Sequence, residues 1–120
     1  MLTQMQKAEN INETTERLNA SDRNYPTLPT GYTNRSTWYI KKGSKVCLYI
    51  TLTKNDNTAI SNVIMFKLPA GYRPIDETYF HLSGYTITNI SAIKISVSGD
   101  VLVSSQDKGV YGYVEFETFS

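Results

Sequence analysis

The sequence predicts an all-β protein, an antiparallel β-sandwich or barrel of about eight short strands, preceded by a short N-terminal coiled-coil helix. Three observations support this prediction. From Thr37 onwards apolar residues recur with a period of two. Turn signals built from Gly, Asn and Asp interrupt them roughly every 8–12 residues. Residues 1–24 contain no Gly, Pro or aromatic residue, which is typical of a helical or a disordered segment.

A heptad repeat runs through residues 1–18, and four of its six a and d positions are apolar. These positions are Met1, Gln4, Ala8, Ile11, Thr15 and Leu18. A single helix of about 27 Å is too short to be stable alone in water, so we expect it to pack against copies of itself. The residues expected to hold the oligomer together are Met1, Ala8, Ile11, Thr15 and Leu18. The alternative is a solvated N-terminal tail.

Residues 25–36 are predicted to be a linker between the helix and the β domain. They include Pro26, Pro29 and Gly31. Proline cannot continue a helix, and it favours extended geometry in the residue before it. We therefore expect a stalk at 1–24, a linker at 25–36 and a head domain at 37–120.

The clearest strand prediction is residues 45–53. Val46, Leu48, Ile50 and Leu52 alternate with other residues there, so they should share the buried face of one strand. Turns are expected at 55–57, 98–100 and 107–109. The other predicted strands are 38–41, 59–68, 78–82, 85–88, 92–97, 101–105 and 110–119.

The composition argues against several function classes. The chain has 12 Lys and Arg against 11 Asp and Glu, and a net charge of +1 offers no basic surface for nucleic acid or an anionic membrane. A single Cys47 and a single His81 exclude an internal disulfide and paired metal ligands. Cys47 lies in mid-strand and is expected to be a buried apolar residue, not a reactive thiol.

Catalytic motifs are also missing from the sequence. It contains no phosphate-binding loop and no nucleophile elbow. Ser83, His81 and Asp76 are crowded into one segment, which gives no geometric support for a catalytic triad. We therefore expect a protein without enzymatic activity, cofactor, metal or membrane insertion.

Uncharged polar and aromatic residues are in excess, with 14 Thr, 11 Ser, 9 Asn and 9 Tyr. Such side chains suit carbohydrate, because sugar hydroxyls match planar hydrogen-bonding groups and sugar C–H faces stack on aromatic rings. The densest cluster is 72–77, which as a purely structural feature would be a loop in which Arg73 pairs with Asp76 or Glu77. The candidate saccharide-binding residues are Trp38, Tyr72, Arg73, Asp76, Tyr79, His81 and Tyr85. Taken alone, each aromatic residue among them is more often part of a core or an interface.

Three segments give the chain a resemblance to a known family, and the first is a predicted strand pair around Trp38 and Val46. Leu-Pro-Ala-Gly-Tyr-Arg-Pro at 68–74 follows a predicted strand, and Ile-Lys-Ile-Ser-Val-Ser-Gly-Asp-Val-Leu-Val at 93–103 forms a hairpin before an aromatic final strand. Over residues 37–120 this pattern resembles the C-terminal head domains of bacteriophage tail receptor-binding and baseplate proteins. The resemblance implies a non-enzymatic all-β head, usually trimeric. In the virion such a head lies at the distal end of the tail, beside other tail or baseplate proteins, and binds cell-wall saccharides of a bacterial host.

Three other interpretations remain open. A baseplate or tail-fibre connector that binds another virion protein would have much the same sequence pattern. A tail depolymerase is disfavoured, because it usually needs β-helix repeats and paired carboxylates in a cleft. A secreted trimeric jelly roll of the tumour-necrosis-factor or complement type also follows an oligomerising stalk, but the sequence shows none of its motifs.

Overall fold

The computed structural model describes residues 22–119. The predicted heptad segment, with Met1, Ala8, Ile11, Thr15 and Leu18, lies outside the described residues. Within them the chain is all-β, as predicted, and its eight strands pair antiparallel. The strands are β1 (Tyr32–Asn34), β2 (Trp38–Lys42), β3 (Lys45–Lys54), β4 (Ile60–Lys67), β5 (Thr78–Ser83), β6 (Ile90–Ile95), β7 (Asp100–Ser105) and β8 (Gly109–Glu117).

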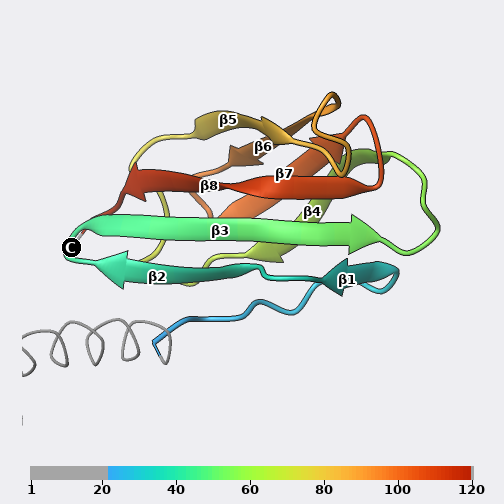
Figure 1. Cartoon of the computed structure of the whole chain (residues 1–120). Coiled ribbons are helices and arrows are strands. Elements are labelled where there is room, and N and C mark those ends of the chain that lie inside the picture. The colour runs from blue at the N-terminus through green and yellow to red at the C-terminus, as the bar shows by residue number, and fades with distance from the viewer. Residues whose placement is uncertain (1–21, 120) are drawn as a thin grey trace, which may run out of the picture.

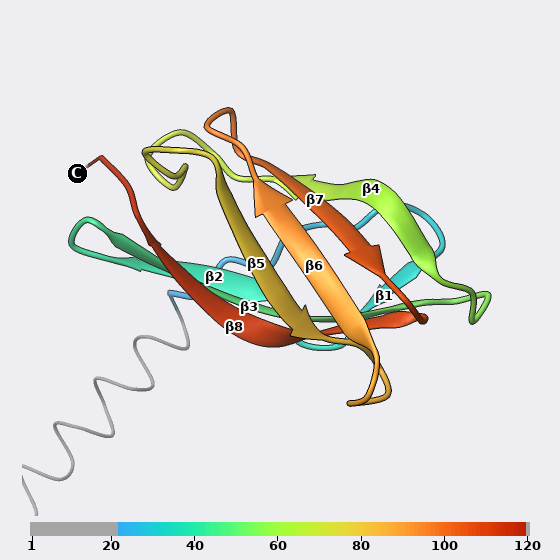
Figure 2. The same cartoon turned by 90° about the horizontal axis from the view of Figure 1, so that it is seen from above.

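The strands form one curled sheet, a half-barrel that folds over its own core (Figure 1). Their order is β1-β3-β8-β5-β6-β7-β4, and β2 also pairs with β3. β3 and β8 pair over nine positions, whereas β8 meets β5 only between Tyr111 and Ser83. This short junction lets the sheet bend, so that β5, β6, β7 and β4 cross above the β2–β3–β8 layer (Figure 2).

The alternation predicted for residues 45–53 is confirmed. Val46, Leu48, Ile50 and Leu52 are fully buried on the inner face of β3. They share one core with apolar side chains of the facing layer, among them Ile93, Ile95, Val101 and Val103. Burial of one such side chain contributes roughly 1.5–3 kcal/mol, so this core holds the two layers together.

β1 lies inside the segment predicted to be a linker. Gly31, with φ of +97°, turns the chain, and the next three residues pair with the end of β3. The Asn34 side-chain oxygen then accepts a hydrogen bond from the Thr37 backbone amide at 2.6 Å. Proline-rich sequence favours extended backbone, which is compatible with a short edge strand, so composition alone did not reveal β1.

The strand predicted at 85–88 is wrong. Residues 84–89 form the connection between β5 and β6, which the Gly84 amide closes by donating to the Asn89 carbonyl at 3.0 Å. The β-branched and aromatic residues of this segment favour a strand. Two of its backbone amides instead donate to the carboxylate of Asp107, which leaves them unavailable to a sheet ladder.

The turns predicted at 55–57, 98–100 and 107–109 are confirmed. At the β6–β7 turn, Gly99 has φ of +95°, a conformation that L side chains rarely adopt. A Cβ atom there would lie 2.5 Å from the Leu68 carbonyl oxygen. Only glycine allows the β6–β7 turn to approach the β4–β5 connection so closely.

The described chain enters and leaves the domain at the same end. The blue start of the described chain, the C-terminus and the β2–β3 turn lie together, and the β3–β4, β5–β6 and β7–β8 connections gather at the opposite end (Figure 1). A backbone hydrogen bond of 2.7 Å from the Lys54 amide to the Lys108 carbonyl ties the end of β3 to the β7–β8 connection. None of the described segments is a helix long and apolar enough to cross a membrane.

Candidate functional site

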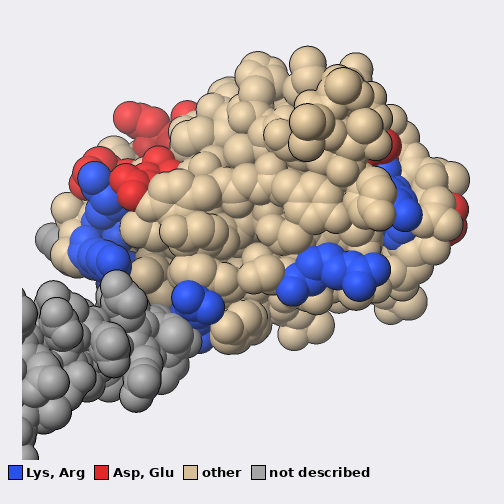
Figure 3. All heavy atoms as spheres, viewed as in Figure 1, with Lys and Arg blue, Asp and Glu red and all other residues tan. Residues whose placement is uncertain are grey.

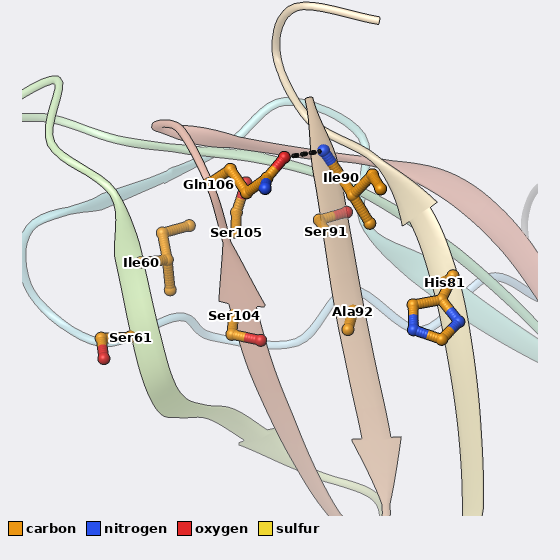
Figure 4. A pocket seen from close by; sticks show the side chains of 9 residues that line it. All are labelled: Ile60, Ser61, His81, Ile90, Ser91, Ala92, Ser104, Ser105 and Gln106. Atoms are coloured by element: carbon orange, nitrogen blue, oxygen red, sulfur yellow. Dashed lines mark hydrogen bonds between the residues drawn. The ribbon is translucent and has the colours of Figure 1, made fainter. Parts of the chain in front are cut away.

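Three side chains stand in one cross-strand row on the outer face of the β5–β6–β7–β4 layer. His81 of β5 pairs with Ala92 of β6, and Ala92 pairs with Ser104 of β7. Paired residues on neighbouring strands project from the same face, about 5 Å apart, and Figure 4 shows the three side by side. Because Ala92 is the smallest of the three, the row has a low apolar centre between an imidazole and a hydroxyl.

A second row runs beside the first and is fixed by Gln106. Ile90 of β6 pairs with Ser83 of β5 on one side. On its other side, the Ile90 carbonyl accepts from the Gln106 backbone amide at 3.1 Å, and the Ile90 amide donates to the Gln106 side-chain oxygen at 2.8 Å (Figure 4). This hydrogen bond uses the oxygen of Gln106, so the side-chain NH₂ group remains as a donor at the edge of the row.

Two open hollows lie along these rows, and both are lined by His81 and Ile90. The first has a volume of about 370 Å³ and lies over β4, β7, β6 and β5. The second has a volume of about 640 Å³ and extends from β5 to β8. We call the combined depression the outer groove. Its lining residues are Ile60, Ser61, His81, Leu82, Ser83, Ile90, Ser91, Ala92, Ser104, Ser105, Gln106, Tyr111 and Gly112.

The outer groove is polar without being charged. Of the described residues that line it, none is Asp, Glu, Lys or Arg. Two of its serine hydroxyls are already used, because Ser91 donates to the Ser83 carbonyl at 2.8 Å and Ser105 to the Gly109 carbonyl at 2.7 Å. The remaining hydroxyl, amide and imidazole groups can both donate and accept hydrogen bonds.

Tyr79 lies on the same face of β5 as His81, beside an ion pair. Lys94 Nζ lies 2.9 Å from Glu77 Oε1 and 5.6 Å from the centroid of the Tyr79 ring. The Tyr79 hydroxyl donates to Glu77 at 3.2 Å. The hydrogen bond from Lys94 lowers the pKa of Glu77, and the same contact raises the pKa of Lys94. Lys94 and Glu77 therefore form an ion pair at the border of the groove.

Tyr85 lies beyond the other end of β5, in a connection held by a carboxylate. Asp107 accepts from the amides of Tyr85 and Thr86 at 2.8 and 2.9 Å and from the Asn89 side chain at 2.8 Å. Burial alone would raise the pKa of Asp107, but these hydrogen bonds outweigh it and hold the pKa well below its usual range. Lys108 Nζ lies 4.2 Å from the centroid of the Tyr85 ring. A fixed loop therefore borders the second hollow.

The outer face of the β2–β3–β8 layer carries an aromatic ladder, which consists of Trp38, Tyr49 and Tyr113. Trp38 pairs with Tyr49 and Tyr49 with Tyr113, and their ring centroids lie 4.2 and 4.4 Å apart. The Arg23 guanidinium lies 3.9 Å from the centroid of the Trp38 ring. Trp38 is 7% exposed, whereas Tyr49 and Tyr113 are 39% and 40% exposed. Figure 3 shows this face as an uncharged expanse with charged side chains of both signs along its border.

Comparison with known proteins identifies the fold. No family model and no curated protein matches the sequence. Among solved structures, the chain is similar to the crystal structure of the receptor binding protein (gp15) of Listeria phage PSA. The TM-score is 0.59 at 16% sequence identity, and the match covers 98% of this chain and 78% of that chain. The described domain has the fold of a phage receptor-binding protein. The fold implied by the sequence resemblance at 68–74 and 93–103 is therefore confirmed.

This phage receptor-binding fold separates the predicted saccharide-binding residues into three places. Tyr79, His81 and Tyr85 follow β5 and the connection after it, along the outer groove or at its border. Trp38 belongs to the aromatic ladder of the other layer. Tyr72, Arg73 and Asp76 lie in the β4–β5 connection, at the opposite end of the domain from the β5–β6 connection (Figure 1).

The cluster at 72–77 differs from the expected ion-paired loop. Arg73 Nε donates to the Leu68 carbonyl at 3.0 Å, and no ion pair joins Arg73 to a carboxylate among residues 22–119. The Tyr72 ring packs edge-on against Tyr39, with centroids 5.3 Å apart, at the margin of the core. Asp76 is exposed on this connection. Arg73 and Tyr72 thus hold the β4–β5 connection in place.

Sequence reasoning missed the partners of His81. Ala92, Ser104 and Gln106 are residue types that do not by themselves indicate a binding site. Only the strand register brings them to the same face as His81. The available signal was alternation, which places every second residue of a strand on the outer face. As predicted, Cys47 is buried, next to Trp38 and Ile40. In the part of the chain that the structure describes, no cluster of His, Cys, Asp or Glu is suited to hold a metal ion.

Proposed function

We propose that the chain is a receptor-binding domain of a phage tail, which adheres through the outer groove to saccharides on the surface of a bacterial host and catalyses no reaction. The observation that carries the proposal is the row of His81, Ala92 and Ser104. The likeness to the Listeria phage receptor binding protein supports a role in receptor binding. A place at the distal end of the tail is what the sequence resemblance implies.

The row has the dimensions and the chemistry that a sugar ring requires. Two strand spacings separate His81 from Ser104, which amounts to roughly 10 Å. A ring lying over Ala92 would place its C–H face on the methyl group. Its hydroxyls would reach the imidazole on one side and the Ser104 hydroxyl on the other, both of which donate and accept.

The openness of the groove favours a weak site that works in several copies. The two hollows lie on an outer sheet face and enclose little of a ligand. Joining weak sites raises the overall avidity without a new contact. We therefore propose a homotrimer assembled through the heptad positions Met1, Ala8, Ile11, Thr15 and Leu18, which would present three grooves together.

A second candidate function is that of a connector that binds another virion protein, and the aromatic ladder favours it. Tyr49 and Tyr113 expose about two-fifths of their surface on a face that also carries Arg23. Tyr, Trp and Arg are the residues most enriched in the centres of protein interfaces. The outer groove and the aromatic ladder share no residue, although both reach β8, so variants can separate the two candidates.

The test compares binding of the purified full chain to bacterial cell walls before and after substitution. Ala92→Trp fills the low centre of the row and should abolish wall binding at an unchanged melting temperature. Tyr113→Ala, in the aromatic ladder, should leave binding intact. Periodate treatment of the walls, which destroys sugar diols, should remove binding, whereas protease treatment should not.

The opposite pattern would favour the connector. In that case the chain would bind no cell-wall preparation but would bind another tail protein, and Tyr113→Ala would abolish this binding. Such a result would assign the function to the aromatic ladder. If Ala92→Trp still bound cell walls, the outer groove would not be the saccharide-binding site.

A further inference from the structure

We infer that the outer groove takes a neutral, extended chain of several sugar units that crosses the strands from β4 to β8. This inference rests on the proposed function and specifies its ligand. It follows from two properties of the groove, its length and its lack of charge.

The length follows from the way the two hollows join. They share His81 and Ile90, and together they pass over β4, β7, β6, β5 and β8. Four strand spacings separate the first of these strands from the last, a span of about 19 Å. A single sugar would contact one hollow only, and a chain running across the strands would contact both.

The two ends of the groove offer different contacts. At the β4 end the outward groups are the hydroxyls of Ser61 and Ser104 and the amide of Gln106. At the β8 end Tyr111 lines the hollow, and its ring centroid lies 6.0 Å from that of Tyr85. Hydrogen bonds would therefore dominate at the β4 end and ring contacts at the β8 end. A chain of several sugar units is long enough to make both kinds of contact.

The lack of charge points to a neutral chain. The charges that border the groove on the β5–β6 side, Lys94 and Glu77, are paired with each other at 2.9 Å. Near the β8 end, Lys108 and Arg35 line neither hollow. Both keep their charge, because Lys108 donates to the neutral Asn57 at 3.1 Å and Arg35 to the neutral Thr53 at 3.3 Å. A phosphate or carboxylate inside the groove would lose hydration without gaining a cation among the lining residues, and such desolvation is costly.

The experiment measures binding of the full chain to an array of bacterial cell-wall glycans. The array carries neutral chains from one sugar to many, and phosphate- or carboxylate-bearing chains of matched length. Binding to neutral chains should rise about tenfold or more from a single sugar to a chain that fills both hollows, because the second hollow is then engaged intramolecularly. Longer neutral chains should bind no better, and matched charged chains should bind at least tenfold more weakly.

Two variants test the ends of the groove separately. Ser104→Trp obstructs the first hollow and Tyr111→Ala removes the ring of the second, and each should weaken binding of the long neutral chain about tenfold. A short chain should be sensitive to only one of them. Leu102→Trp is the matched control, since Leu102 precedes Ser104 by two residues on the same face of β7 and lies outside both hollows. If Ser104→Trp lowers the melting temperature, Gln106→Ala replaces it at the same end.

The outcomes separate this inference from the proposed function. Equal binding of single sugars and long chains, preference for the charged chains, or insensitivity of the long chain to either end variant would overturn the inference and leave the saccharide function standing. A chain that binds no glycan on the array and no host wall would overturn both.

Discussion

The Asp107 carboxylate accepts a hydrogen bond from the Tyr85 backbone amide at 2.8 Å, which joins the β7–β8 turn to the β5–β6 connection. The same carboxylate accepts from the Gly109 amide at 2.9 Å. A single side chain therefore orders two loops at one end of the outer groove. Such preordering lowers the entropy that the loops would lose on binding a ligand.

Replacing Asp107 should destabilise the domain. Asp107→Asn keeps the shape but weakens hydrogen bonds to a charged acceptor, and should lower the free energy of unfolding by about 1–3 kcal/mol in urea denaturation at neutral pH. Because the pKa of Asp107 is lowered in the folded state, its contribution is present above the unfolded value near 4 and is lost as the pH falls. The difference between wild type and variant should therefore shrink below about pH 4.

Asp76→Asn is the matched control, because Asp76 is exposed on the β4–β5 connection. It should leave the free energy of unfolding nearly unchanged. A difference between wild type and Asp107→Asn that is constant from neutral to acidic pH would mean that the charge of Asp107 is not what stabilises the loops.

Removing the Arg23 guanidinium should expose the indole of Trp38. Trp38 is the single tryptophan of the chain, so its fluorescence reports on this one contact. Arg23→Ala should shift the emission to longer wavelength and cost about 0.5–2 kcal/mol of stability. Arg23→Lys should produce a smaller shift, because it keeps the cation without the planar group. An unshifted spectrum in Arg23→Ala would show that other groups cover the ring.

Two glycines with positive φ should respond differently to alanine. Gly43→Ala places a methyl group in open space at φ of +62°, so only backbone strain remains, at about 1 kcal/mol. Gly99→Ala adds a contact of 2.5 Å with the Leu68 carbonyl oxygen, and should cost roughly twice as much or more in urea denaturation. Equal losses in the two variants would mean that the β6–β7 turn can move away from Leu68.

Deleting residues 1–20 should weaken or abolish trimer formation. In the predicted coiled coil, Met1, Ala8, Ile11, Thr15 and Leu18 pack against the same positions of the other helices. The sequence predicts no other segment against which the apolar residues among them could pack. Sedimentation analysis of the full and the shortened chain measures the effect. A shortened chain that sediments as the same trimer would place the assembly contacts in the β domain.

The sequence predicted the strands whose side chains alternate cleanly and the turns with strong local signals. β3 is the best example, since four apolar residues at alternate positions fix its buried face. The segment 85–88 shows the limit of this reasoning. This segment has strand propensity, but two of its backbone amides donate to Asp107, which lies about twenty positions later in the sequence. The local sequence pattern does not reveal this distant hydrogen-bond acceptor.

The candidate site was predicted only in part. His81 and Tyr79 were selected for their chemistry, and the structure places both on one face of β5. The partners of His81 depend on strand register, which joins β5 to β6 and β6 to β7 and follows from the whole sheet. Trp38 was selected for its ring, but Arg23 and Tyr49 both pack against that ring, and the residue is 7% exposed. Tyr49 and Tyr113 are the open rings of that face.

The most direct test of saccharide binding by the outer groove is an NMR titration of the isotope-labelled full chain with cell-wall saccharide released from a bacterium to which it adsorbs. We expect chemical-shift changes centred on His81, Ala92 and Ser104, with Tyr49 and Tyr113 unaffected. Changes confined to the aromatic ladder, or no changes at saturating saccharide, would contradict it.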